Sequence, residues 1–374
     1  MEKLNRKVFY LAGFDPRGVR YYYGLYREQV ARYAALSGED VTVSARRAGP
    51  ASSAVWTVTN DAAGVETDYE FLRWEDLVAG KWIRSPLLLA WRSVGAFVGN
   101  LRFMQLVRMR RLRKGPVITI LYPPILGTLI PLVYALVPAL LLWIMLPFWA
   151  AAAIGVAVSA VTAGRRIRAM MIPWLLRFHA YHHRLAAQGP GPELDERLDL
   201  FARRIVETFG EPWDEILIIT HSAGTIQAMS LLRRLLDLHG PRLPDNVTLV
   251  CMGQVVPVVG LRTDACWYHA DLRALADKQF RYVDFSAPPD GAAYYNVNPL
   301  LLVADQYVAR VDMLSPRFHI FYDPENRRHG YASKYEAHFD YLRVGDRISP
   351  VDFVSLTAGP RTIDESIALF RALP

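Results

Sequence analysis

The stretch Glu215-Ile-Leu-Ile-Ile-Thr-His-Ser-Ala-Gly-Thr-Ile-Gln-Ala-Met229 decides the fold of this chain. Its apolar, β-branched run from Ile216 to Ile219 predicts a buried strand. A polar turn centred on Ser222 follows, and the apolar spacing after Gly224 predicts a helix. A strand, a tight turn with a central serine and a helix together lift the serine hydroxyl above the end of a sheet. They also leave the free N–H groups of the helix N-terminus beside it.

This arrangement resembles the nucleophile elbow of the α/β-hydrolase superfamily, in which Ser222 would be the nucleophile. The superfamily pattern is Gly-x-Ser-x-Gly, and Thr220 occupies the first glycine position. That position is usually small because the strand and helix backbones come close there. The alternative is a buried strand and a helix joined by a polar turn without chemistry. The resemblance implies acyl-transfer chemistry, with the helix N-terminus facing the negative charge that develops on the substrate.

A stretch from Pro116 to Gly164 contains no Asp, Glu, Lys, Arg, His, Asn or Gln. A bilayer core about 30 Å thick needs about 20 apolar residues per helix, so the stretch predicts a transmembrane helical hairpin. Basic clusters at 108–114 and 165–168 flank it, which predicts that both of its ends lie in the cytoplasm. Prolines inside the stretch can kink or break helices, so the position of the turn stays open. One long tilted span and an apolar soluble lid are the alternatives.

The positive charge of the chain is concentrated around this stretch. Residues 77–192 hold 14 lysines and arginines and no acidic residue, whereas the whole chain carries a net charge of +7. The remainder is therefore acidic overall. Because the basic residues are interleaved with Leu, Val, Phe and Trp, we expect a lipid bilayer containing anionic lipids as the partner. No nucleic-acid-binding motif is present, and we expect no nucleic-acid partner.

Strand and helix patterns alternate outside the apolar stretch. Strands are expected near residues 7–13, 41–45, 56–60, 69–74, 216–219, 247–252, 280–285 and 318–322, and helices near 21–36, 87–107, 193–209 and 270–277. This alternation predicts an α/β fold with a mostly parallel sheet covered by helices on both faces. We expect residues 1–80 and 191–374 to form the two parts of an α/β-hydrolase-like domain. Residues 81–190 would be a membrane-associated insertion carrying the hairpin at about 116–164.

A serine nucleophile needs a general base and an acid that orients the base. In α/β-hydrolases the acid follows a late strand and the histidine comes after it. The resemblance therefore implies Asp290, in a Pro-Pro-Asp-Gly turn, as the acid, with Asp284 as the alternative. Asp-Gly also favours a turn by itself. His338 is the expected base and His329 the alternative, whereas His319 is expected to be a strand residue.

The segment around His338, His-Phe-Asp-Tyr-Leu, resembles one in an uncharacterised group of bacterial membrane-linked α/β-hydrolases that are lipase- or esterase-like. The turns Gly13-Phe-Asp-Pro16 and Ala287-Pro-Pro-Asp-Gly291 and the stretch Gly253-Gln-Val-Val-Pro257 are similar to that group too. The resemblance implies a protein of the bacterial inner membrane with its catalytic domain on the cytoplasmic side.

An oxyanion hole needs two hydrogen-bond donors. The Ala223 N–H directly follows the nucleophile and is expected to be the first donor. The second donor is expected from the loop after the first strand, where Phe14 N–H is the candidate.

Cofactor signals are weak. The cluster His179-Ala-Tyr-His-His183 is similar to a histidine motif of di-iron desaturases, but such sites need several clusters, so we expect no metal. Cys251 and Cys266 are too few for a disulfide framework. No glycine-rich phosphate loop is present, so we expect no nucleotide cofactor.

Together these features predict a membrane-anchored serine hydrolase, esterase- or lipase-like, that cleaves a lipid or acyl ester through an acyl-enzyme. An acyltransferase would use the same three residues. A catalytically inactive membrane scaffold or lipid-binding protein is the alternative from a different class. The sequence leaves the identity of the substrate and the oligomeric state open.

Overall fold

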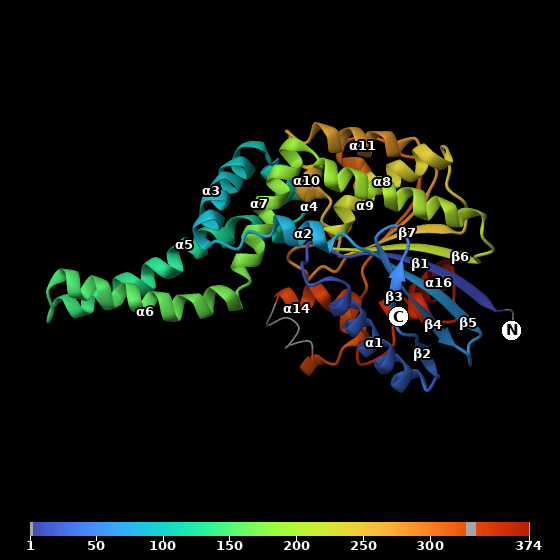
Figure 1. The fold of residues 1–374 in the computed structure, drawn as a ribbon, viewed down its shortest axis with the longest axis horizontal. Coiled ribbons are helices and arrows are strands. Elements are labelled where there is room, and N and C mark those ends of the chain that lie inside the picture. The colour runs from blue at the N-terminus through green and yellow to red at the C-terminus, as the bar shows by residue number, and fades with distance from the viewer. Residues whose placement is uncertain (1–2, 327–333, 374) are drawn as a thin grey trace.

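Within residues 3–326 and 334–373, which the computed structural model describes, a mixed sheet of nine strands forms the centre of the body (Figure 1). The strand order is β2-β4-β5-β1-β6-β7-β8-β9, and β3 pairs with β4. The strands are β1 (Leu4–Leu11), β2 (Val41–Val43), β3 (Arg47–Gly49), β4 (Ser53–Asn60), β5 (Val65–Leu72), β6 (Glu215–His221), β7 (Val247–Met252), β8 (Arg281–Phe285) and β9 (Arg310–Leu314). The α/β class predicted from the alternating pattern is confirmed.

The sheet is mixed, with its antiparallel strands gathered at one edge. The neighbours β5, β1, β6, β7, β8 and β9 run parallel, whereas β2, β3 and β4 form antiparallel pairs. Residues 61–64 alone join β4 to β5, and a connection that short permits only antiparallel pairing. Strands from before and after the apolar stretch meet where β1 pairs with β6, from Arg6 opposite Glu215 to Leu11 opposite Thr220.

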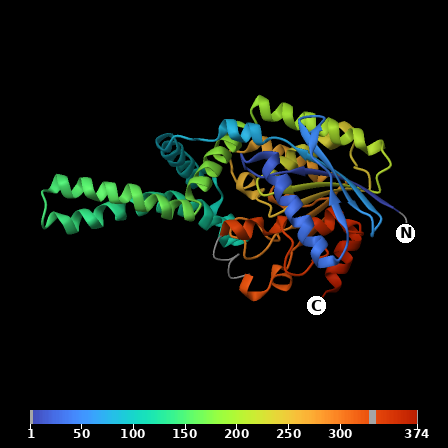
Figure 2. The same ribbon diagram turned by 60° about the horizontal axis from the view of Figure 1, so that its bottom comes forward.

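Helices cover both faces of the sheet (Figures 1 and 2). One face packs against α8 (Pro192–Glu207), α9 (Gly224–His239) and α11 (Cys266–Ala276), and the other against α1 (Gly18–Ser37), α15 (Phe353–Ala358) and α16 (Ile363–Ala372). Alternate residues of β6 belong to opposite cores: Ile216 and Ile218 to the first, Leu217 and Ile219 to the second. The run is continuously apolar because successive side chains of a strand point to opposite faces and both faces are buried.

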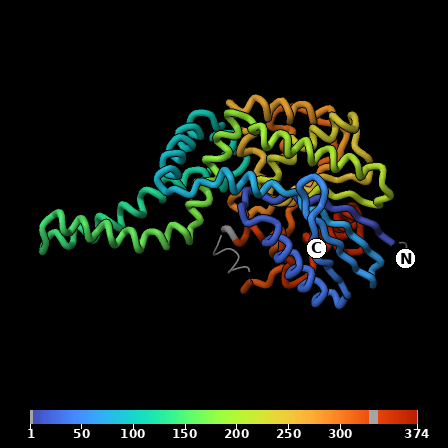
Figure 3. The backbone as a smooth tube through the Cα atoms, in the orientation of Figure 1, coloured from blue at the N-terminus to red at the C-terminus, as the bar shows by residue number. Residues whose placement is uncertain are grey.

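A helical hairpin of α5 (Lys114–Trp143) and α6 (Phe148–Ala169) projects from one end of the body (Figure 3). Both helices are long and apolar enough to cross a membrane, judged by length and composition. The most apolar part of α5 has no residue buried inside the structure. The predicted pair of apolar helices is therefore present.

The hairpin turns at residues 144–147, a position that the sequence left open. The N–H groups of Met145 and Leu146 both donate to the carbonyl of Leu142. Most prolines of the stretch lie inside α5 and do not end it: Pro123, Pro124, Pro131 and Pro138. Pro147 is different, because it immediately precedes α6. The expectation that prolines could break the helices therefore applies only at the turn.

The two helices of the hairpin pack closely through small residues of α6. Ala151, Gly155, Ser159 and Ala163 recur at every fourth position and are buried. A Cβ atom on Gly155 would overlap the Ala135 carbonyl oxygen. The Ser159 hydroxyl donates to the Pro131 carbonyl at 2.8 Å. Small residues at this spacing let membrane helices approach closely, so this stripe fixes the pairing of α5 with α6.

We expect Gly155→Leu to separate α5 from α6, because a larger side chain would overlap the α5 backbone; overpacking of this kind costs about 1–3 kcal/mol. Spin labels at the exposed positions Leu136 and Val161 would report a longer and broader distance distribution in electron–electron double resonance. Val156→Leu, on the exposed face of α6, is the control and should leave the distribution unchanged. Equal distributions in both variants would contradict the packing described.

Four helices connect the hairpin to the sheet: α2 (Glu75–Lys81), α3 (Pro86–Phe103), α4 (Leu106–Leu112) and α7 (Ile172–Gln188). The predicted helical stretch at residues 87–107 corresponds to α3 and the start of α4. Small and polar residues of α3 face the body, with Ser93, Ala96 and Gly99 buried. Most of its large apolar residues are exposed instead, among them Leu87 and Trp91, although Leu89 is buried. The helix is therefore amphipathic with its apolar face turned outward.

The prediction of a strand at residues 318–322 is wrong. That segment forms the short helix α12 (Phe318–Phe321), and the last parallel strand is β9, which lies earlier in the chain. The alternation of Phe318, Ile320 and Tyr322 is too short to separate a strand from a helical turn. Strand β9 escaped prediction because it is an edge strand, only partly buried, with Arg310 and Asp312 among its five residues.

Candidate active site

Ser222 lies in the turn between β6 and α9 with a left-handed backbone conformation, φ 55°. Its N–H donates to the Met252 carbonyl at 3.0 Å, and its own carbonyl accepts from Thr225 N–H at 3.0 Å. A positive φ at a residue other than glycine is costly and persists only where the surroundings hold it. The turn therefore has the strained geometry expected of a nucleophile elbow.

Glycines around the turn allow its backbone to approach β1. A Cβ atom on Gly224 would lie 2.6 Å from the Leu11 carbonyl oxygen, and one on Gly13 would lie 3.0 Å from the Ser222 Cβ. Thr220, which stands at the first glycine position of the superfamily pattern, is fully buried in β6. Its hydroxyl donates toward the Cys251 sulfur at 3.3 Å. A threonine is accommodated there because its side chain lies between β6 and β7.

The structure brings together the three residues predicted to act on the substrate. The His338 Nε2 atom lies 2.7 Å from the Ser222 Oγ atom. The His338 Nδ1 atom lies 2.7 Å from the Asp290 Oδ2 atom. His338 comes from α14 (Lys334–Phe339) and Asp290 from the loop after β8. In this arrangement the imidazole can take the serine proton on one nitrogen while the carboxylate holds the other.

Asp290 is buried and accepts two further hydrogen bonds, from Ala292 N–H at 2.9 Å and from the Tyr341 hydroxyl at 3.1 Å. Burial raises the pKa of Asp290, but the neighbouring His338 and these hydrogen bonds outweigh burial and lower the pKa below its usual value. The carboxylate is therefore ionised at neutral pH, as a partner of a His338 imidazolium must be.

Tyr341 was not predicted as a site residue. Its hydroxyl donates to Asp290 and accepts from Ala287 N–H at 2.8 Å, so it joins the acid to the start of its own loop. A Cβ atom on Gly253 would lie 2.6 Å from the Tyr341 ring. The tyrosine follows His338 by three residues, a spacing that places both side chains on one side of a helical turn. The spacing within the His-Phe-Asp-Tyr segment is the sequence signal that could have identified Tyr341 as a site residue.

The alternative site residues lie elsewhere. Asp284 is fully buried in β8 and accepts from the Ser286 hydroxyl at 3.1 Å. Burial raises its pKa well above the usual value, which favours the neutral acid. His319 lies on α12, and His329 lies outside the described residues. Of these candidates, Asp290 and His338 are the pair that the described structure places beside Ser222.

His221 supports the position of His338. Its Nε2–H donates to the His338 carbonyl at 2.8 Å, and the two rings lie 5.0 Å apart. Burial lowers the pKa of His221 to about 3, so the ring is neutral and acts as a hydrogen-bond donor. Because the bond goes to the backbone of α14, it fixes the helix that carries the expected base.

The two candidate oxyanion donors come from two segments that meet at the serine. Ala223 immediately precedes α9, and Phe14 follows Gly13, whose Cβ position is in contact distance of Ser222. Within the described part of the chain, neither backbone N–H donates to a protein acceptor. In the described residues both N–H groups thus lack a protein acceptor, which the donors of an oxyanion hole require.

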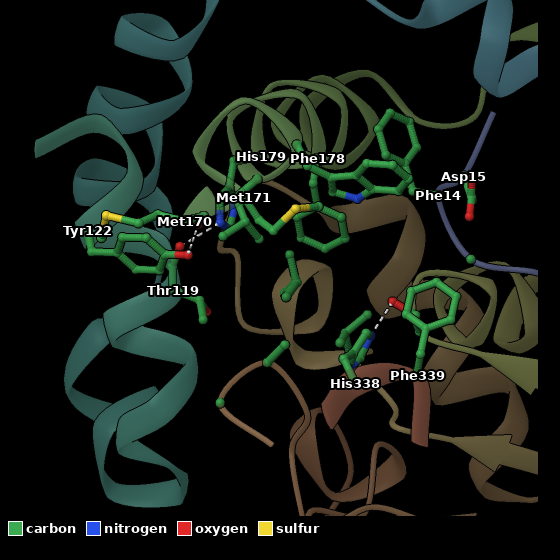
Figure 4. Close-up of a pocket in the computed structure, with 18 of the residues that line it drawn as sticks. Phe14, Asp15, Thr119, Tyr122, Met170, Met171, Phe178, His179, His338 and Phe339 are labelled. Carbon is green, nitrogen blue, oxygen red and sulfur yellow. Dashed lines mark hydrogen bonds between the residues drawn. The ribbon is translucent and has the colours of Figure 1, made fainter. Parts of the chain in front are cut away.

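A cavity of about 480 Å³ opens beside Ser222. His338 and Phe339 lie at one end, and Thr119 and Tyr122 of α5 at the other (Figure 4). The side chains in between are mostly apolar and include Phe178 of α7 (Figure 4). The cavity therefore links the serine to the foot of the hairpin.

His179 has a structural role in this wall. Pro123 lacks an N–H, so it leaves the carbonyl of Thr119, four residues earlier, without its helical donor. The His179 Nε2–H donates to that carbonyl at 3.0 Å. Burial lowers the pKa of His179 to about 4, which keeps the ring neutral. In the described residues no group of three or more His, Cys, Asp or Glu side chains is arranged to hold a metal ion.

Comparison of the chain with protein-family models, with curated proteins and with solved structures returns no match. The geometry of Ser222, His338 and Asp290 is therefore the basis for a functional assignment.

The lowered pKa of Asp290 predicts an acid-dependent stability. Ionised Asp290 stabilises the folded state above its unfolded pKa of about 3.9, and this contribution is lost as the pH falls through the lower folded pKa. We expect the difference in unfolding free energy between wild type and Asp290→Asn to be constant above about pH 5. This difference in unfolding free energy should become smaller below about pH 4. Urea unfolding in detergent between pH 3 and 6 measures it, and a difference that grows on acidification would contradict the assignment.

Proposed function

We propose that this chain is a membrane-anchored serine hydrolase of the α/β-hydrolase type that cleaves carboxylic esters. The observation that carries the proposal is the pair of 2.7 Å contacts from His338 to Ser222 and to Asp290. The strained turn at Ser222 and the free N–H groups beside it support the same chemistry.

In the proposed reaction His338 Nε2 takes the proton of Ser222 as the serine oxygen attacks the ester carbonyl. The N–H groups of Ala223 and Phe14 stabilise the oxyanion of the tetrahedral intermediate. The leaving alcohol takes the proton from His338, and the acyl group stays on the serine. His338 then takes a proton from water as the water attacks the acyl-enzyme, and it returns this proton to the Ser222 oxygen when the acid leaves. Asp290 holds the imidazole in place and stabilises its charged form.

Membrane attachment is supported by the exposed apolar hairpin and by α3. Large apolar side chains form a stripe along the outer face of α3 at helical spacing: Leu87, Trp91, Val94, Val98 and Leu101. Arg84, Arg92 and Arg102 lie within or beside the same helix. An exposed apolar stripe with basic neighbours suits a helix at the surface of a membrane with anionic lipids. The basic residues at both ends of the hairpin favour a cytoplasmic body.

A fluorophosphonate probe tests the nucleophile, because such probes bond covalently to activated serines. We expect labelling of the detergent-solubilised wild type and no labelling of Ser222→Ala. Ser44→Ala, at an exposed serine, is the control and should label like wild type. A well-folded wild type that does not label would favour the inactive scaffold.

Asp290→Asn tests the orienting acid. The amide holds His338 in the wrong tautomer, so we expect kcat to fall about 10⁴-fold, as in other serine hydrolases with this arrangement. Release of p-nitrophenol from p-nitrophenyl butyrate measures the rate, and adding an acceptor alcohol distinguishes a hydrolase from an acyltransferase by its product. The matched variant Asp284→Asn should keep the larger part of the activity. If only Asp284→Asn lost activity, Asp284 and not Asp290 would be assigned as the orienting acid.

A further inference from the structure

We propose that the cavity beside Ser222 is an acyl-chain site that opens to the bilayer at the foot of the hairpin. The inference rests on the proposed hydrolase function and adds its substrate class: an ester of a long-chain acyl group held in the membrane. The ester carbonyl would lie at Ser222, and the chain would extend along α7 toward α5.

The walls of the cavity are apolar over most of its length. Phe14, Met171, Trp174, Phe178 and Val258 line the part between the serine and α5. A cavity of about 480 Å³ falls within the usual size of small-molecule sites, about 300–1,000 Å³. An acyl chain gains from such a surface because its methylene groups need no polar partner.

Polar groups of the wall are already bonded within the protein. Asp15 pairs with Arg17 at 2.6 Å and accepts from the Tyr22 hydroxyl at 3.0 Å. His179 bonds to the Thr119 carbonyl. The groups that remain directed at a ligand are therefore those of the serine end, which suits a molecule with one ester and a long apolar tail.

The far end of the cavity lies at the expected level of the membrane surface. From Pro124 to Trp143, α5 spans about 30 Å, which matches the apolar core of a bilayer. The basic cluster at 165–168 marks the same level on α6. Leu126 of α5 and Met170, after α6, line the cavity at this level. A chain leaving the bilayer here meets apolar protein without crossing water.

The Tyr122 hydroxyl donates to the Met170 carbonyl at 3.1 Å and so joins α5 to the connection between α6 and α7. This bond holds the two sides of the far end at a fixed separation.

Leu126→Trp tests the site, because the larger side chain would fill its far end. Ile125→Trp is the matched control, since the neighbouring side chain of the same helix is exposed and does not line the cavity. The substrates are p-nitrophenyl acetate in solution and p-nitrophenyl palmitate in vesicles of phosphatidylcholine and phosphatidylglycerol. The readout is the ratio of kcat/KM for palmitate to that for acetate.

We expect wild type and Ile125→Trp to favour palmitate, and Leu126→Trp to lower the ratio at least tenfold. Fluorophosphonate labelling of each variant reports whether Ser222 is still active. Labelling with equal ratios in the two tryptophan variants would overturn the acyl-chain site and leave the hydrolase intact. A wild type that hydrolyses acetate faster than palmitate would overturn it as well. Absence of labelling in wild type would instead reject the hydrolase itself.

Discussion

The close approach of the Ser222 turn to the end of β1 is the constraint on which the rest of the structure depends. Gly224 has no room for a side chain there, since the Leu11 carbonyl oxygen lies 2.6 Å from its Cβ position, and Gly13 has little, since the Ser222 Cβ lies 3.0 Å away. The contact places the N-terminus of α9 above the sheet and brings the Phe14 loop beside the serine. Ser222, a helix terminus and the Phe14 N–H are thereby positioned by packing of the backbone, before any side chain is considered.

The parallel strands convert this local contact into a site. β6, β7 and β8 are neighbours that run in one direction, so the loops after them meet at one edge of the sheet. Ser222 follows β6 and Asp290 follows β8, and α14 returns the chain to the same edge with His338. Residues separated by 48 and 116 positions along the chain are in this way within hydrogen-bond distance of each other. His221 and Tyr341 then hold the histidine and the acid in place.

Local sequence patterns predicted the parts of this structure that depend on residues adjacent in the sequence. The strand at β6 and the apolar helices are visible as apolar runs, and the serine turn is visible as a short motif between a strand pattern and a helix pattern. Strands were predicted near β2, β4 and β5 but not their antiparallel pairing, and β3 and β9 were not predicted as strands. The half-buried edge strand Arg310–Leu314 lacks an apolar run. Tyr341 and the bond from His179 to Thr119 were missed for another reason. Their hydrogen-bond partners are set by tertiary packing, so the spacing that places Tyr341 beside His338 does not identify them.

The turn of the hairpin has a consequence for how the chain would insert in the membrane attachment proposed above. Residues 144–147 are Ile-Met-Leu-Pro, and the flanking Trp143 and Phe148 are apolar as well. No charged side chain has to pass through the hydrocarbon core, where each would cost about 2.5–3.5 kcal/mol at the centre. The turn can lie at the interface of the opposite leaflet, where tryptophan is enriched. Insertion then requires no translocated loop, and a finished chain could enter the bilayer from the side on which it folds.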